Sequence, residues 1–305
     1  MPRPSILLHV AALVSLAACG ASSHSGTGPA GPPAPPGFVN GPSGPIRVDD
    51  GGAPAAAAAA ASAMPIIFVH GLAADRHVWD DALAHERATR RALAFDLHGM
   101  GESAPSARND YSIDSFAADL AAVVDGVQPP LPARFVLVGH SLGGTVVTAY
   151  AAAHPERVAG IVYVDAPPDM TSIPPATVQQ FEAGVAPASV ERFSAALFDG
   201  MLESAQPATK QRVLASLHAT PPAVISGAFV AMLHYDPKPA LARYAGLRLA
   251  LVTRGNDEPI SIHHLVSGIE HQMVDGVSHW LMMDKPTEFA ATLDGFLAHA
   301  GTTTK

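Results

Sequence analysis

Residues 135–153 read FVLVGHSLGGTVVTAYAAA and carry more structural information than any other part of this chain. Phe135–Val138 is a short apolar run with the length of a buried strand. It leads directly into a G-x-S-x-G sequence, Gly139–Gly143, and then into a helical pattern. Because glycine has no Cβ, the chain can turn sharply at this point and present the Ser141 hydroxyl above the sheet. The N–H groups at the start of the next helix would face the same spot and favour negative charge there. The pattern therefore predicts that Ser141 is a nucleophile.

The sequence on both sides of this turn continues the alternation of strands and helices. Short apolar strands followed by helices are typical of an α/β fold with a mostly parallel, twisted sheet that is covered on both faces. Strands are predicted near residues 46–48 and at 66–69, 92–96, 135–138, 160–164, 248–253 and 271–274. Helices are predicted at residues 82–90, 115–127, 142–153 and 286–300.

Residues 167–244 break this alternation. They show helical patterns interrupted by prolines and no convincing strand, which predicts a helical lid inserted between two strands. The lid helices are apolar, and we expect them to face an apolar pocket. Five large side chains either line that pocket or pack the lid itself: Phe181, Phe193, Phe198, Phe229 and Met232.

Several motifs together resemble the α/β-hydrolase superfamily over roughly residues 46–300. Besides the Ser141 turn, they are Phe68–Gly71, Phe95–Ser103, Tyr163–Ala166 and Gly276–Pro286. The chain is most similar to the small-lid branch that contains esterases and hydroxynitrile-lyase-like proteins. The resemblance implies the α/β-hydrolase fold and, through the serine, a carboxylesterase- or lipase-like serine hydrolase. Such an enzyme would cleave carboxylic esters or related acyl bonds through an acyl-enzyme, without a cofactor.

The resemblance also implies roles for individual residues. The order in this fold is serine, acid, then histidine. His279 is the only histidine in the last strand–helix loop, so it is the expected general base. The His-Gly pair that precedes Leu72 implies that the Leu72 N–H forms an oxyanion hole with the N–H of Leu142.

The triad acid has three candidates. Two of them follow the strand at residues 248–253, where Asp257 and Glu258 are adjacent. The Asn-Asp-x-Pro pattern favours Asp257, whereas spacing from the preceding glycine favours Glu258. The third candidate is Asp165, which directly follows the strand at residues 160–164.

The N-terminus resembles a bacterial lipoprotein signal. Residues 1–18 contain Arg3 and an apolar run that is too short to span a bilayer comfortably, and the sequence Leu16-Ala17-Ala18-Cys19-Gly20 resembles a lipobox. This resemblance implies that Cys19 becomes a lipidated N-terminus on the membrane, with the outer membrane favoured. The catalytic domain would then lie in the cell envelope, outside the cytoplasm. Residues 19–44, rich in Gly, Pro, Ser and Ala, are predicted to be a disordered linker, and residues 45–305 the hydrolase domain.

The charge of the chain and its adjacent histidines argue against other kinds of partner. The net charge is −9 and no basic run is present, which argues against nucleic acid as a partner. His263 and His264 are adjacent and would face different ways on a helix, so no metal site is expected. The rivals to a hydrolase are lyase or perhydrolase chemistry on the same fold, or a surface binding protein without turnover. No pattern predicts an oligomeric state.

Overall fold

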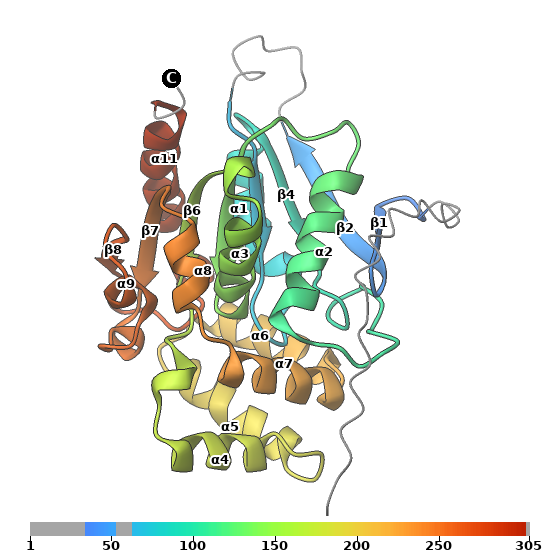
Figure 1. Cartoon of the computed structure of the whole chain (residues 1–305), viewed down its shortest axis with the longest axis vertical. Coiled ribbons are helices and arrows are strands. Elements are labelled where there is room, and N and C mark those ends of the chain that lie inside the picture. Colours follow the sequence, from blue (N-terminus) through green and yellow to red (C-terminus); the bar gives the residue numbers. More distant parts are fainter. Residues whose placement is uncertain (1–33, 53–62, 303–305) are drawn as a thin grey trace, which may run out of the picture. The chain divides into compact units, whose positions relative to one another are not determined.

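The fold is built on a single eight-stranded sheet (Figure 1). The computed structural model describes residues 34–52 and 63–302. The strand order is β1-β2-β4-β3-β5-β6-β7-β8. The pairs β1–β2 and β2–β4 are antiparallel, and every other pair is parallel. The predicted α/β-hydrolase fold, with a mostly parallel sheet between helices, is confirmed.

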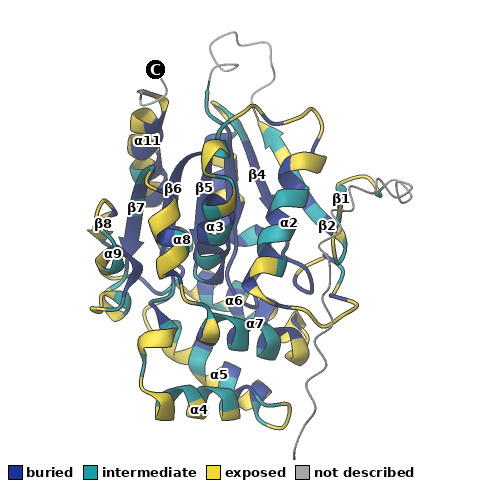
Figure 2. Ribbon diagram, viewed as in Figure 1, coloured by how far each residue is buried: buried dark blue, intermediate teal, exposed yellow. Residues whose placement is uncertain are grey.

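The central strands are buried along their whole length, as Figure 2 shows. They consist almost entirely of apolar residues, because a parallel sheet covered on both faces exposes neither set of side chains to water. The strands are β1 (Phe38–Gly41), β2 (Gly44–Gly52), β3 (Ile66–Val69), β4 (Arg91–Phe95), β5 (Phe135–His140), β6 (Val158–Val164), β7 (Leu247–Val252) and β8 (Glu270–Met273).

Two groups of helices cover the sheet. In one group, α2 (Ile113–Gly126) packs against α3 (Leu142–Ala153), which in turn contacts α8 (Lys238–Arg243). In the other group, α1 (Asp80–Glu86) packs against α11 (Pro286–Thr302). Because the central strands are parallel, the turns that lead from strand to helix lie at the same end of the sheet. Ser141 lies in one of these turns.

The predicted linker is wrong at its C-terminal end. Residues 38–41 form β1, which pairs antiparallel with β2, and the folded unit begins at Ala34. Phe38 and Val39 supply the apolar side chains that the prediction overlooked, and Val39 is buried in the core. Two residues, Pro42 and Ser43, connect the strands in a tight hairpin. The predicted signal peptide and Cys19 lie outside the described residues.

Five helices lie between β6 and β7, and Figure 1 shows α4 to α7 gathered beyond one end of the sheet. The first four are α4 (Pro175–Gly184), α5 (Val190–Met201), α6 (Pro207–Ala219) and α7 (Pro222–His234), and α8 completes the set. We refer to α4–α7 as the lid. Among the described residues, no single helix is long and apolar enough to cross a bilayer. Taken together, α6 and α7 have the length and composition of a span, but the two helices are bent by 103° relative to each other.

A buried carboxylate, Asp169, holds the two ends of this insertion together. Asp169 follows β6 and accepts hydrogen bonds from the Thr171 N–H (3.0 Å), the Thr171 hydroxyl (2.6 Å) and the Ser172 hydroxyl (2.5 Å). Its carboxylate also pairs with Lys238, the first residue of α8. Asp169 therefore joins the segment that enters the insertion to the one that leaves it.

Candidate active site

Ser141 occupies a strained turn between β5 and α3. Its backbone has φ 49° and ψ −124°, a conformation that residues with a side chain rarely adopt. Glycines on both sides make the turn possible. A Cβ on Gly139 would lie 2.4 Å from the carbonyl oxygen of Gly143, and one on Gly143 would lie 2.2 Å from that of Val69. The turn predicted from the sequence is therefore present, with Ser141 at its apex.

His279 pairs with the carboxylate of Asp165. The imidazole Nδ1 lies 2.6 Å from Asp165 Oδ2, and both side chains are largely buried. Asp165 directly follows β6 and, like Ser141, has a positive φ, 46°. Thr253, directly after β7, donates to Asp165 from its N–H (2.8 Å) and its hydroxyl (2.9 Å). These hydrogen bonds leave the carboxylate facing the imidazole.

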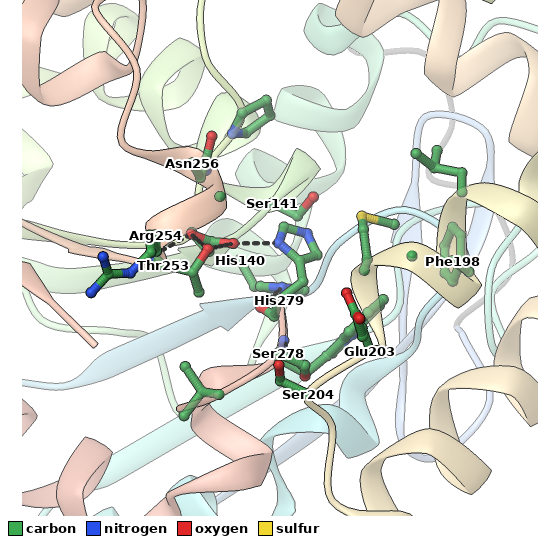
Figure 3. A pocket seen from close by; sticks show the side chains of 18 of the residues that line it. His140, Ser141, Phe198, Glu203, Ser204, Thr253, Arg254, Asn256, Ser278 and His279 are labelled. Carbon is green, nitrogen blue, oxygen red and sulfur yellow. Dashed lines mark hydrogen bonds and ion pairs between the residues drawn. The ribbon is translucent and has the colours of Figure 1, made fainter. Parts of the chain in front are cut away.

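Figure 3 shows the side chain of Ser141 next to the imidazole of His279, with the pocket open beside them. No hydrogen bond joins the two side chains in the described part of the chain. In ligand-free enzymes such contacts are often long and tighten only when substrate binds. The three side chains thus follow the order hydroxyl, imidazole, carboxylate.

The loop around His279 is held at several points. Asp284 accepts hydrogen bonds from the N–H of Ser278 (2.7 Å) and from its hydroxyl (2.6 Å). The His279 N–H donates to the carbonyl of Met201, at the end of α5, over 3.3 Å. The loop that carries the ring is therefore held both by its own hydrogen bonds and by the end of α5.

His140, next to Ser141, contacts the loop that carries His279. Its ring lies 4.6 Å from the ring of His279, centroid to centroid, and its Nε2 is 3.0 Å from the His279 carbonyl oxygen. Burial, together with the nearby charge of His279, lowers the pKa of His140 well below 6.5. The imidazole is therefore neutral at neutral pH, and its Nε2–H donates to that carbonyl. No role of His140 could be predicted from the sequence, because no local pattern shows which loop packs on it.

The two predicted oxyanion donors lie close to Ser141. Leu142 is the first residue of α3, so its N–H has no acceptor within the helix. The Leu72 N–H donates to no other described residue, and both Leu72 and Ser141 line the same cavity. Neither N–H therefore has an acceptor among the described residues.

A cavity of about 900 Å³ opens beside Ser141 and His279. Its apolar side comes largely from the lid, including Phe181, Phe198, Met201, Phe229 and Met232. Of the five side chains proposed from the sequence, Phe193 is the one that does not line it; this ring packs against Phe181 and Phe229 instead. Polar side chains line the cavity in two places: Figure 3 shows Arg254 and Asn256 on one side of His279, and Glu203 and Ser204 on the other.

The choice of Asp257 as partner of His279 needs correction. Asp257 Oδ1 lies 3.0 Å from the Nε2 atoms of both His263 and His264, on the far side of its loop. Glu258 is exposed and bonds through its backbone to Ser261. The residue of this loop that reaches toward the site is Asn256, which donates to the carbonyl of Ala166 over 2.6 Å. Asp165, the third candidate, holds the position beside His279.

The expectation that His263 and His264 face different ways is also wrong. Both lie on α9 (Ile262–Leu265), a single turn, and their rings are 4.1 Å apart. Both rings turn toward the carboxylate of Asp257, which attracts both imidazole nitrogens. Side chains of this length can converge even from adjacent positions on a short helix.

A family model described as the alpha/beta hydrolase fold matches residues 64–236, more than half of the 305-residue chain. The chain belongs to the α/β-hydrolase fold family. The matched range of this α/β-hydrolase includes Ser141 and Asp165 and ends just after α7, before His279.

Curated relatives of this α/β-hydrolase include esterases. An esterase of Mycobacterium tuberculosis is 36% identical over 130 residues, which cover 43% of this chain and 42% of the relative. A pimeloyl-[acyl-carrier protein] methyl ester esterase of Neisseria meningitidis is 37% identical over 93 residues, covering 30% and 33%. The chain therefore matches less than half the length of either relative. Among solved structures, an esterase from Exiguobacterium antarcticum has a TM-score of 0.71 at 17% identity, covering 86% of this chain and 98% of the other. At that identity the likeness shows the fold alone.

Proposed function

We propose that this α/β-hydrolase is a serine hydrolase that cleaves carboxylic esters or related acyl bonds. The observation that carries the proposal is the contact between His279 Nδ1 and Asp165 Oδ2 (2.6 Å), beside the strained turn at Ser141. A buried carboxylate on one imidazole nitrogen leaves the other nitrogen to accept the serine proton. The partial matches to esterases agree with this chemistry.

In the proposed mechanism, His279 Nε2 removes the proton of the Ser141 hydroxyl as its oxygen attacks the acyl carbonyl. The carbonyl oxygen becomes an oxyanion that the N–H groups of Leu72 and Leu142 bind. Protonated His279, stabilised by Asp165, gives its proton to the leaving alcohol, and an acyl-enzyme remains. Water, deprotonated by His279, then releases the acid and restores Ser141.

The cavity favours neutral substrates with short or medium acyl chains. Its lid side is apolar and would take the acyl group out of water. Glu203, just after α5, places a carboxylate on the cavity wall, and no ion pair with another described residue neutralises it. Substrates that carry a carboxylate of their own are therefore expected to react poorly.

The test is covalent labelling with a fluorophosphonate, which reacts only with an activated serine. We expect wild type to be labelled at Ser141, and Ser141→Ala to lose both the label and the hydrolysis of a p-nitrophenyl ester. Ser204→Ala is the matched control, because Ser204 lines the same cavity away from the His279–Asp165 pair and should keep the label. Labelling that survives in Ser141→Ala would overturn the proposal. So would a wild-type protein that is neither labelled nor active, an outcome that would favour a binding protein.

A further inference from the structure

A second cluster of polar side chains lies on the loop after β7. Asp257 Oδ1 is 3.0 Å from His263 Nε2 and 3.0 Å from His264 Nε2. All three ligand-type atoms lie within 4.8 Å of one another. The site described above uses none of these side chains.

The spacing of these atoms fits a zinc ion. Zinc binds imidazole nitrogen and carboxylate oxygen at about 2.0–2.2 Å, so neighbouring ligands of a tetrahedral ion lie roughly 3.4 Å apart. The observed 3.0 Å from the carboxylate oxygen to each nitrogen is close to that separation. A zinc ion would take the place of the protons between these atoms, and the two imidazole nitrogens, which lie no more than 4.8 Å apart, would close to the same separation.

The loop is already folded into the arrangement that a metal would need. The Ser261 hydroxyl donates to the carbonyl of Asn256 (2.6 Å) and accepts from the N–H of Glu258 (2.9 Å). The side chain of His263 is 1% exposed, whereas that of Asp257 is 37% exposed. One ligand is thus fixed by packing, and an open side admits the ion.

A third imidazole lies beside this cluster. The ring of His271, on β8, is 4.7 Å from that of His263, centroid to centroid. It could supply a fourth ligand by rotation, or leave that position to water. Another group of ligand-type side chains, His85, Glu86 and Asp294, is weaker because it has one histidine and its Glu86 is committed to Arg90 (2.7 Å).

We propose that Asp257, His263 and His264 bind a zinc ion that fastens the loop after β7. Gly255 and Asn256 of this loop line the cavity beside Ser141, and the Asn256 side chain holds the carbonyl of Ala166. The ion would therefore stiffen one wall of the active-site cavity without touching the reacting groups.

The test is zinc binding by metal-free protein, measured by calorimetry and by the visible spectrum of the cobalt-substituted form. All proteins carry Cys19→Ser, because a free thiolate would bind zinc by itself. We expect one equivalent of zinc and a cobalt spectrum typical of tetrahedral coordination. At a hundredfold excess over Kd, the melting temperature should rise by about 5–10 °C.

Two variants remove ligands at the exposed side of the cluster, where folding is least at risk: His264→Gln and Asp257→Asn. Each should weaken zinc binding by at least about tenfold and abolish the thermal shift. His85→Gln should bind as wild type does, and so should Ser141→Ala, which separates this site from the proposed enzymatic one. Absence of binding at micromolar zinc would overturn the proposal, as would binding that persists unchanged in both ligand variants or is lost in His85→Gln.

Discussion

The carboxylate of Asp165 accepts hydrogen bonds from two elements, the loop that carries His279 and the residue after β7, Thr253. Each of its oxygens therefore has a partner, and the group stays oriented beside the imidazole. Asp257, the acid preferred from the sequence, satisfies two other imidazoles instead.

At the residue scale, the first prediction separates these two carboxylates. Asp165→Asn should lower kcat by about 10³–10⁴, because the amide cannot stabilise protonated His279 and favours the wrong tautomer. Asp257→Asn should change kcat by less than about threefold. Steady-state kinetics on one ester, with circular dichroism to check folding, measure both. Equal losses in the two variants would contradict the assignment of Asp165.

The second prediction concerns Glu203, which lines the cavity and which Figure 3 shows between Phe198 and Ser204. Removing its charge in Glu203→Gln should raise kcat/KM for a carboxylate-bearing ester by up to about fivefold at low salt. The value for a neutral ester of the same size should stay the same. Glu191→Gln, on an exposed position of α5 outside the cavity, is the matched control. Unchanged discrimination between the two esters in Glu203→Gln would exclude this electrostatic role.

At the scale of elements, the strands and helices were largely predictable from periodicity. The runs at residues 66–69, 92–96 and 160–164 coincide with β3, β4 and β6 within two residues. These strands are buried on both faces, so their apolar runs are continuous and bounded by turn residues. The strand β1 was missed because only two of its four residues are bulky and apolar and it lies at the edge of the sheet, where pairing and not burial defines it.

The proposed acid was harder to predict than the proposed nucleophile, for a physical reason. The nucleophile depends on a local turn that its own glycines permit, so its signature lies within five residues. The acid depends on which neighbouring strand ends closest to His279, and β6 and β7 end side by side with carboxylates just beyond each. The local sequence Tyr163-Val164-Asp165-Ala166 shows a carboxylate at the end of a buried strand but not its direction.

The third prediction concerns the anchor between the lid segment and α8. Burial acts to raise the pKa of Asp169, but hydrogen bonds from Lys238, Ser172 and Thr171 outweigh it and lower the pKa from 3.8 to about 2. That difference corresponds to about 2 kcal/mol of stability near neutral pH. Asp169→Asn should lower the free energy of unfolding at pH 7 by about this amount, as measured by urea denaturation.

The pH dependence of this contribution has a definite sign. The pKa of Asp169 is lower in the folded state than in the unfolded state. Its stabilisation is therefore complete above about pH 4 and disappears as the pH falls toward 2. The difference in the free energy of unfolding between wild type and Asp169→Asn should therefore become smaller as the pH falls from about 4 toward 2. Asp199→Asn, which breaks an exposed pair with Lys210, should cost less than about 1 kcal/mol. A gap independent of pH would show that Asp169 acts through packing and not through its charge.

At the scale of the whole molecule, we propose that this α/β-hydrolase is held on a bacterial membrane, with the outer membrane favoured, by a lipid on Cys19. The support is the lipobox-like sequence around this single cysteine, after a short apolar run. Cys19→Ser should abolish incorporation of labelled palmitate and move the protein from the membrane fraction to the soluble fraction of the cell envelope. Ester hydrolysis by the released protein should match wild type. Retention of Cys19→Ser in membranes, with the label still incorporated, would refute the anchor.

Ser141 and Asp165 stand at the ends of adjacent strands, β5 and β6, and the lid enters the chain only afterwards. Only the imidazole arrives from beyond the insertion, on a loop that makes its own hydrogen bonds to Asp284. A different lid could therefore be exchanged into this position while the hydroxyl and the carboxylate keep their spacing, provided that it again offers an acceptor to the His279 N–H, as Met201 does at the end of α5. Selection can thus alter which molecules enter the pocket through one continuous stretch of the gene, while two of the three side chains stay in place.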